Sequence, residues 1–237
     1  MNKSWNILLW NIRGINSESK LLALRNAIYT SGCSVLCIQE TKRESFNLAF
    51  IKSFYPKRFD KFVFAPWIGA SGGIITIWNS SVFVGTPWHV ESFAVGVSFV
   101  ATQSNESWNL VNVYGPCTGQ GRADFTSWLF DLTIPDDENW LILGDFNYIR
   151  STENRNKPGG DASDMLLFNE LIRAQSLMEI PVKGRAFTWS NMQDDPLLEQ
   201  LDWFFTTSDW ISHYPNTVGF LLAKTVSDHV PCVVSID

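Results

Sequence analysis

Short, uninterrupted apolar segments that end in polar residues constrain the fold of this chain more than any other feature. Three of them are NILLWNI (6–12), SVLCIQET (34–41) and NWLILGDFN (139–147). A continuous apolar run of this length is typical of a strand that is buried on both faces. We therefore expect these segments to form buried strands, with their polar residues at the strand ends.

Helical and further strand patterns alternate with these segments. Apolar residues recur at helical spacing over 18–32, where Gly32 is the expected stop, and over 122–132 and 161–177. Additional short strands are expected in segments that are separated by Gly, Pro and Ser. These segments are 61–66, 72–78, 81–92, 93–102, 107–116, 186–191, 199–207 and the closing 218–237. The punctuation favours antiparallel pairing.

This order of elements predicts a four-layer α/β sandwich. Two mixed, mostly antiparallel β-sheets would pack face to face, with the helices outside them. The sequence has no Gly/Ser linker, no charge block and no fixed-period repeat, so we expect one domain over residues 1–237.

Composition excludes some classes of protein and leaves others open. The net charge of −6 argues against a protein that coats nucleic acid through bulk electrostatics, because that mode needs many lysines and arginines. A nuclease remains possible, since a divalent ion offsets part of the carboxylate charge of its site. No membrane span or signal peptide is expected, and we expect an intracellular protein. The four cysteines (Cys33, Cys37, Cys117, Cys232) show no paired spacing, so buried thiols are expected rather than disulfides.

Several polar residues are expected to share one placement, at the C-terminal ends of apolar strands. They are Asn11, Glu40, Tyr114, Asp145, Asn147 and Asp202, and the pair Asp228-His229 joins them. Taken singly, each could be a turn residue or a satisfied core group. Together they predict a site where strands open into loops at one rim of the sandwich.

Asp202 and His229 form the most informative pair of this set. Asp202 lies in LEQLDWFF, where its apolar neighbours favour burial, and a buried carboxylate requires a partner or a metal ion. The protonated imidazole of His229 is the expected partner. The alternative for the segment TVSDHVPCVV (225–234) is a plain turn, in which Asp228 bonds nearby amides.

Six ordered motifs resemble the endonuclease/exonuclease/phosphatase superfamily. They are LLWNIRG, CIQET, VNVYGP, LILGDFN, LDWFF and SDHVP, and they span nearly the whole chain. This superfamily includes abasic-site repair endonucleases, DNase I-like enzymes and the endonuclease domains of non-LTR retrotransposons. LLWNIRGIN, NYIRSTENR and RAFTWSN look most like a LINE-type retrotransposon endonuclease, with features of plant elements.

The resemblance implies a role for each matching position, and every role below is an expectation carried over from the family. Glu40 would be the main metal ligand, with Asn11 in the same metal and phosphate pocket and Asp228 as a metal-side carboxylate. Asp145 and Asn147 would orient the attacking water and contact the scissile phosphate. Tyr114 would offer a hydroxyl to the phosphate, and His229, bonded to Asp202, would bind its oxygens. Thr188 would contact the DNA backbone.

The chemistry of these side chains agrees with such a site. Carboxylates such as Glu40, Asp145 and Asp228 are hard oxygen ligands, which suit Mg²⁺ or Mn²⁺. The ion would act as a Lewis acid on the phosphate, while an anchored carboxylate would turn water into a nucleophile.

Two departures from the family pattern stand out. Some repair enzymes carry a second acid where this chain has Arg13, and related retrotransposon domains often carry a basic residue near the LD motif, where this chain has Gln200 and Trp203. Arg150, Arg155 and Lys157 could supply a basic rim that binds DNA, and a solvated loop is the alternative for them.

The sequence as a whole predicts a Mg²⁺- or Mn²⁺-dependent endonuclease that nicks double-stranded DNA, and a DNA target favours the nucleus. The resemblance implies a 3′-hydroxyl product, a role in target-primed retrotransposition and a reverse transcriptase domain in the same longer polyprotein. The alternatives are an abasic-site repair endonuclease or another phosphoesterase of this fold, and a catalytically dead binding domain.

Overall fold

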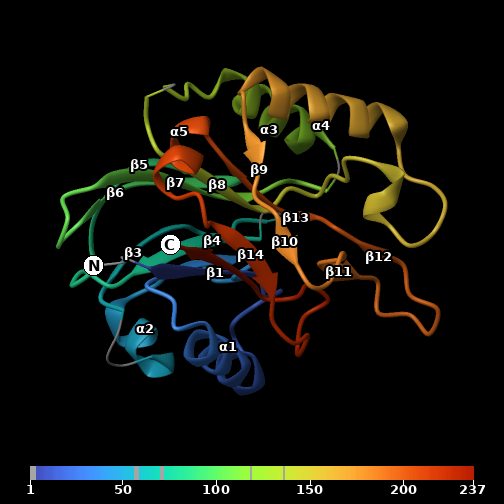
Figure 1. Cartoon of the computed structure of the whole chain (residues 1–237). Coiled ribbons are helices and arrows are strands. Elements are labelled where there is room, and N and C mark those ends of the chain that lie inside the picture. The colour runs from blue at the N-terminus through green and yellow to red at the C-terminus, as the bar shows by residue number, and fades with distance from the viewer. Residues whose placement is uncertain (1–3, 56–58, 70–71, 118, 136) are drawn as a thin grey trace.

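Two β-sheets lie face to face at the centre of the molecule, and helices cover their outer sides (Figure 1). This computed structural model describes residues 4–55, 59–69, 72–117, 119–135 and 137–237. The expected four-layer α/β sandwich is confirmed, and both sheets are mixed with mostly antiparallel pairs.

The first sheet has the strand order β10-β14-β15-β1-β2-β4-β3 within the described residues. Its strands are β1 (Trp5–Asn11), β2 (Val35–Gln39), β3 (Lys61–Ala65), β4 (Ile74–Trp78), β10 (Val182–Lys183), β14 (Val218–Leu221) and β15 (Cys232–Ile236). β1 is parallel to β2 and antiparallel to β15. The ends of β1 and β2 therefore meet the start of β15 at one edge of the sheet.

The second sheet has the order β5-β6-β7-β8-β13-β9 over the same described part of the chain. Its strands are β5 (Phe83–Glu91), β6 (Ala94–Ala101), β7 (Ser107–Tyr114), β8 (Trp140–Asp145), β9 (Met178–Glu179) and β13 (Asp202–Thr206). A separate two-stranded ribbon contains β11 (Trp189–Ser190) and β12 (Leu198–Glu199). β7 and β8 are parallel, whereas β8 and β13 are antiparallel.

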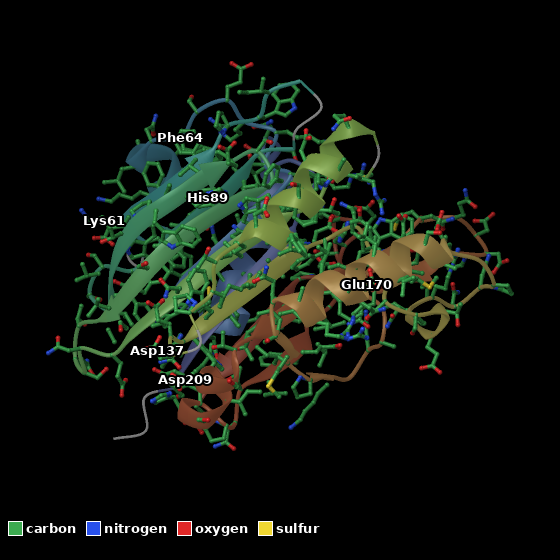
Figure 2. All side chains as sticks on the ribbon, turned by 90° about the horizontal axis from the view of Figure 1, so that it is seen from above. Lys61, Phe64, His89, Asp137, Glu170 and Asp209 are labelled. Carbon is green, nitrogen blue, oxygen red and sulfur yellow. The ribbon has the colours of Figure 1, made fainter. Side chains whose placement is uncertain are left out.

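Helices form the outer layers. They are α1 (Glu18–Ser31), α2 (Leu48–Phe54), α3 (Gln120–Asp131), α4 (Ala162–Ala174), α5 (Ser208–His213) and the 3₁₀ turn η1 (Thr152–Asn154). α1 and α2 lie against the first sheet, whereas α3 and α4 lie on the second (Figure 1). In Figure 2, which looks onto that second side, α4 is marked by Glu170 and lies beside α3. Among the described residues, no helix combines the length and apolarity needed to cross a bilayer.

Burial on both faces explains the uninterrupted apolar strands. Leu9 of β1 packs into the core between the two sheets, whereas its neighbour Leu8 packs into the core beneath α1 and α2, with Leu24. A third buried cluster fills the space between the second sheet and α3 and α4, and includes Phe125 and Phe168. Successive side chains of a strand point to opposite faces, so a strand between two cores must be apolar at every position.

Local signals fix the helix boundaries. Ser17 caps α1 by accepting from the Lys20 amide, and Gly32 ends it in the left-handed conformation at φ 59°, as expected. α2 and α5 were not expected, because they are too short for a clear helical period. Residues 199–207 were expected to form one strand, but the structure divides this segment between β12 and β13.

Cysteine burial agrees only in part with expectation. Cys33, Cys37 and Cys232 are buried, whereas Cys117 is exposed in the loop after β7.

Candidate active site

Asn11 and Glu40 lie together at the ends of two parallel strands. Asn11 is the last residue of β1, and Glu40 directly follows β2. The Asn11 side-chain nitrogen donates to Glu40 Oε1 at 3.0 Å and to Asp145 Oδ2 at 2.8 Å. One amide therefore bridges an acid of the first sheet and an acid of the second.

Asp145 and Asp202 lie side by side on adjacent strands of the second sheet. Asp145 ends β8, Asp202 begins β13, and the two are register partners in this antiparallel pair. Asp202 was expected at the C-terminal end of a strand, which is wrong: it is the first residue of its strand. It still reaches the same rim, because an antiparallel strand starts where its partner ends.

His229 lies between these two acids. Its Nδ1 is 2.9 Å from Asp202 Oδ2 and its Nε2 is 3.5 Å from Asp145 Oδ2, with all three residues 3% exposed or less. Ser227 Oγ fixes the loop, because it accepts from the His229 amide and donates to the Asn11 carbonyl at 2.8 Å. The segment 225–234 is thus more than a plain turn.

The surroundings of this trio determine its charges. Burial alone would lower the pKa of His229, but the carboxylates of Asp202 and Asp145 outweigh burial and raise that pKa to about 9. Burial raises the pKa of Asp145 to about 7, although His229 and the Asn11 hydrogen bond act in the opposite direction. At neutral pH His229 is therefore an imidazolium ion, and Asp145 is poised to exchange a proton.

Tyr114 and Asn147 complete the rim. Tyr114 ends β7 near Glu40; burial, followed by the Glu40 charge, raises the pKa of its hydroxyl far above the ordinary value. The Asn147 amide is held by the Gly115 carbonyl at 2.6 Å, and its backbone N–H donates to Asp145 Oδ1 at 3.1 Å. Its φ of 55° is unusual for a residue other than glycine and is typical of functional sites. Both side chains are therefore fixed neutral hydrogen-bonding groups.

The described residues contain two possible sets of metal ligands. Asp145, Asp202 and His229 place ligand atoms within 4.8 Å of one another. A protonated imidazole cannot ligate a metal, however, so this trio fits a proton-holding role better. Glu40 suits a divalent ion: it is a hard carboxylate, 9% exposed, at the edge where the two sheets meet.

Two predicted ligands have other engagements. Asn11 turns its nitrogen toward Glu40, while its oxygen accepts from the Arg13 amide at 3.2 Å. A metal-ligand role for Asn11 would require that amide to turn over. Asp228 accepts from Trp189 Nε1 at 3.0 Å and also from Arg13.

Thr188 has an internal role that the sequence did not indicate. It is 2% exposed, and its Oγ1 accepts from the backbone amides of Leu201 and Asp202, each at 3.0 Å. The geometry therefore argues against the expected contact with the DNA backbone. Thr188 instead fixes the start of β13 and with it the position of Asp202.

The three predicted rim cations are paired with acids. Arg155 Nε lies 3.4 Å from Glu199 Oε1, with the Arg155 side chain 12% exposed, and Lys157 Nζ lies 2.6 Å from Asp195. Arg150 pairs with Glu179. These contacts do not present an unpaired basic surface, and the DNA-binding role of Arg155 stays a prediction.

The cations nearest the acids come from elsewhere in the chain. Arg13 contacts both Glu40 and Asp228, and Lys42 Nζ lies 3.9 Å from Glu40 Oε2. Arg13 was noted in the sequence only as a departure from the family pattern. Its proximity to Asp228, more than two hundred positions along the chain, depends on tertiary structure alone.

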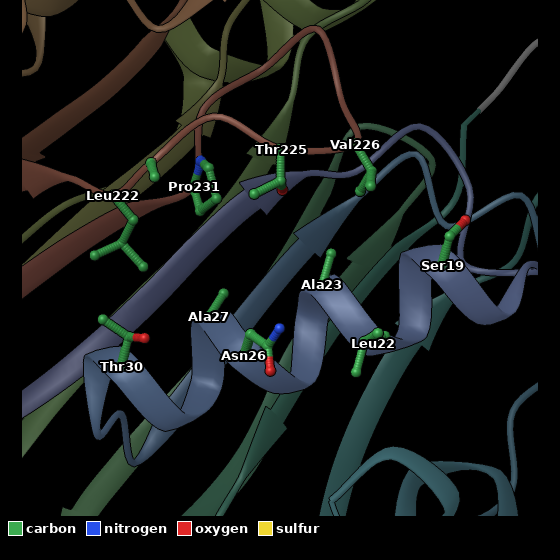
Figure 3. Close-up of a pocket in the computed structure, with 11 residues that line it drawn as sticks. Ser19, Leu22, Ala23, Asn26, Ala27, Thr30, Leu222, Thr225, Val226 and Pro231 are labelled. Atoms are coloured by element: carbon green, nitrogen blue, oxygen red, sulfur yellow. The ribbon is translucent and has the colours of Figure 1, made fainter.

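A separate groove lies between α1 and the segment that leads from β14 toward His229 (Figure 3). Its volume is about 430 Å³, and Ala23, Ala27, Thr225 and Pro231 are among its lining residues. None of the residues that line it is titratable, so it is distinct from the acid and histidine site.

Comparison of the sequence with known proteins identifies a family and a relative. The model of the Endonuclease/Exonuclease/phosphatase family matches residues 8–229. The Transposon TX1 uncharacterized 149 kDa protein of Xenopus laevis is 27% identical over 233 residues, which cover 92% of this chain and 17% of that protein. The chain thus spans only a small part of this relative's length.

Two solved structures share the fold. AP endonuclease LMAP from Leishmania major has a TM-score of 0.74 at 18% identity, with 98% of this chain and 87% of that chain covered. The endonuclease domain of TRAS1, a telomere-specific non-LTR retrotransposon, has a TM-score of 0.71 at 14% identity, with 99% and 98% covered. At such identities the likeness concerns the fold.

Proposed function

Since the chain belongs to the Endonuclease/Exonuclease/phosphatase family, we propose that it is a divalent-metal-dependent phosphodiesterase that nicks double-stranded DNA. One observation carries the proposal. The imidazolium of His229 lies between the buried carboxylates of Asp145 and Asp202, beside the Asn11 amide that links Asp145 to Glu40. A general base, a phosphate-binding cation and a metal-binding acid are thereby gathered at one edge.

Asp145 is the proposed base. A pKa of about 7 lets Asp145 accept a proton near neutral pH. The backbone N–H of Asn147 fixes its Oδ1, and the Asn11 side chain fixes its Oδ2. Asp145 would orient and deprotonate the attacking water.

His229 is the proposed phosphate ligand. Its raised pKa keeps it protonated, so that it can stabilise the negative charge that develops on the phosphate oxygens, while Asp202 holds the ring. The neutral hydroxyl of Tyr114 would contribute a further hydrogen bond to the same phosphate. The side-chain N–H groups of Asn147 contact the Gly115 carbonyl and Asp145 Oδ2, so its part would be to hold Asp145 in place for the water.

Glu40 is the residue that we propose to hold Mg²⁺ or Mn²⁺. The bound ion would supply Lewis-acid stabilisation of the phosphate charge. Glu40 itself is kept in place by the side-chain amide of Asn11, which donates to its Oε1.

The biological setting follows from the similarity to transposon proteins. We propose that the nick leaves a 3′-hydroxyl, which a reverse transcriptase domain of the same longer polyprotein extends at the target. The length of the Xenopus laevis relative, of which this chain matches 17%, supports such a polyprotein. A DNA target of this kind would place the activity in the nucleus.

Three duplexes separate the substrate classes. The purified chain would be incubated, with Mg²⁺ or with EDTA, with three DNA substrates. They are an intact duplex, the same duplex with one abasic site, and the same duplex with a nick that carries a 3′-phosphate. We expect Mg²⁺-dependent cleavage of intact DNA and extension of the product by a polymerase without prior phosphatase treatment. Cleavage restricted to the abasic duplex would replace the proposal with a repair activity, and cleavage of none would contradict DNA nicking.

A further inference from the structure

Arg13 lies between two acids of the site. Its Nη1 donates to Asp228 Oδ2, and its Nε is 3.6 Å from Glu40 Oε2. The Arg13 side chain is 47% exposed, whereas those of Asp228 and Glu40 are each 11% exposed. A half-exposed guanidinium therefore connects two largely buried carboxylates and keeps one side open to solvent.

The backbone holds Arg13 in this place. Its φ is 53°, a left-handed conformation that costs a residue other than glycine about 1 kcal/mol or more. The Arg13 amide donates to Asn11 Oδ1 at 3.2 Å, and the next amide, of Gly14, donates to the Glu40 carbonyl at 2.6 Å. The Gly14 bond ties the turn after β1 to the turn after β2, so the backbone from which the Arg13 side chain extends is fixed beside Glu40.

One oxygen of Asp228 is already occupied by protein donors. Its Oδ2 accepts from Arg13 and from Trp189 Nε1, the latter at 3.0 Å, whereas the Ser227 hydroxyl donates its proton to the Asn11 carbonyl. A carboxylate oxygen that accepts from an indole and a guanidinium is better suited to anchoring a cationic side chain than to binding a hydrated ion.

We infer that Arg13 is the second cation of the site: it occupies the space between Glu40 and Asp228 that a second divalent ion would need, and binds a phosphate oxygen of the DNA with its free N–H groups. The inference rests on the proposed function and deepens it. A guanidinium has five N–H donors, of which only part face the two acids, and a fork of this shape matches a phosphate. Such a site would bind one divalent ion per chain, with Arg13 as a positioning charge.

Counting bound Mn²⁺ tests the first half of this inference without DNA or catalysis. Electron paramagnetic resonance of free Mn²⁺ would be followed as the full chain is titrated, for the wild type, Arg13→Lys and Arg13→Asp. We expect one bound ion for the wild type and Arg13→Lys, and two for Arg13→Asp, because the added carboxylate both removes the cation and supplies a ligand. Two ions in the wild type, or one in a folded Arg13→Asp, would overturn it.

DNA binding in EDTA tests the second half and does not depend on Arg13→Asp folding. The affinity of Arg13→Gln for a 20-base-pair duplex would be measured at several salt concentrations. We expect a loss of about tenfold and a salt slope smaller by about one, as for a lost phosphate contact. Arg173→Gln, which alters an exposed arginine on α4, is the matched control and should behave as wild type.

An Arg13→Gln variant that binds DNA with wild-type affinity and salt slope would overturn the inference. The outcome is separable from that of the proposed function. A wild-type chain that nicks DNA yet binds two ions removes the role of Arg13 and keeps the nuclease. A chain that does not nick DNA removes the nuclease, while the ion count still decides the role of Arg13.

Discussion

His229 and Asp202 form a buried ion pair, in which His229 Nδ1 lies 2.9 Å from Asp202 Oδ2. His229 is 3% exposed and Asp202 is 1% exposed. The pairing gains strength because water cannot screen it, and it outweighs the burial that would otherwise lower the pKa of His229. The same pair orients the ring so that Nε2 faces Asp145.

A bell-shaped pH dependence of nicking follows from the two shifted groups. Asp145 must be ionised, which occurs as pH rises through about 7, and His229 must be protonated, which is lost as pH rises through about 9. We expect the highest single-turnover rate between these values. A rate that keeps rising beyond pH 10 would contradict a protonated His229.

Asp202→Asn should move the alkaline limb of this profile. Removing the Asp202 charge leaves burial as the main influence on His229, so its pKa should fall by at least about one unit, and nicking should fall about 100-fold or more. Asp209→Asn is the matched control, since Asp209 pairs with His213 at 3.3 Å on the surface. If the alkaline limb is the same in wild type and Asp202→Asn, then His229 is not the group responsible for it.

Thr188→Val should destabilise the protein and slow nicking together. The substitution leaves two buried backbone amides, of Leu201 and Asp202, without an acceptor, which costs about 2 kcal/mol of unfolding free energy. Urea unfolding and nicking rates measure both effects, and Thr188→Ser should restore both. DNA affinity in EDTA should stay unchanged; a loss of affinity at wild-type stability would instead indicate a direct contact with DNA.

Asn112→Ala should be among the more destabilising polar substitutions. The Asn112 amide lies between the two sheets, where it accepts from Gln39 and donates to the Ile75 carbonyl and Thr76 Oγ1, both at 3.1 Å. Losing it leaves buried polar groups unsatisfied, at a cost of about 2 kcal/mol or more in denaturant titrations.

Asn109 provides the control for this experiment. It lies on the same strand and bonds Ser98 and Glu138, but it is only partly buried, so water can replace its partners. Asn109→Ala should change stability by less than about 1 kcal/mol. An equal loss of unfolding free energy in the two variants would show that the hydrogen bonds of Asn112 between the sheets stabilise the protein no more than those of Asn109.

Gly72→Ala should disturb Glu40 directly. A Cβ at Gly72 would lie 2.6 Å from Glu40 Cγ and 2.9 Å from the Tyr114 ring, so Glu40, the proposed metal ligand, must shift. We expect nicking at low Mg²⁺ to fall about 100-fold, since misplacement of a reacting group by an ångström has effects of that size. Gly121→Ala on α3, where the nearest atom is 3.2 Å away, should keep wild-type activity.

The fold could be predicted because its strands carry their signal locally. The central residues of NILLWNI and NWLILGDFN are apolar since each strand lies between two cores, and Gly32 ends α1 where expected. α2 and α5 could not be predicted, because one or two helical turns leave no period to detect. The family resemblance drawn from six motifs was confirmed by the match over residues 8–229.

The site could be predicted as a set of residues, and one of its contacts, between Asp202 and His229, was predicted as well. Strand-end polar residues identified Asn11, Glu40 and Asp145, and the structure joins them through one amide. The burial of Thr188, the pairing of Arg155 with Glu199 and the position of Arg13 depend on segments distant in sequence. No local pattern encodes such contacts.

Nicking of supercoiled plasmid tests the central claim most directly. The purified chain, Glu40→Gln and His229→Gln would be compared at pH 8 with Mg²⁺ and with EDTA, and circular dichroism would establish that each variant is folded. We expect relaxed circles from the wild type with Mg²⁺ only, and a rate at least about 100-fold lower for both variants. Relaxation in EDTA, or by folded Glu40→Gln at the wild-type rate, would contradict this claim.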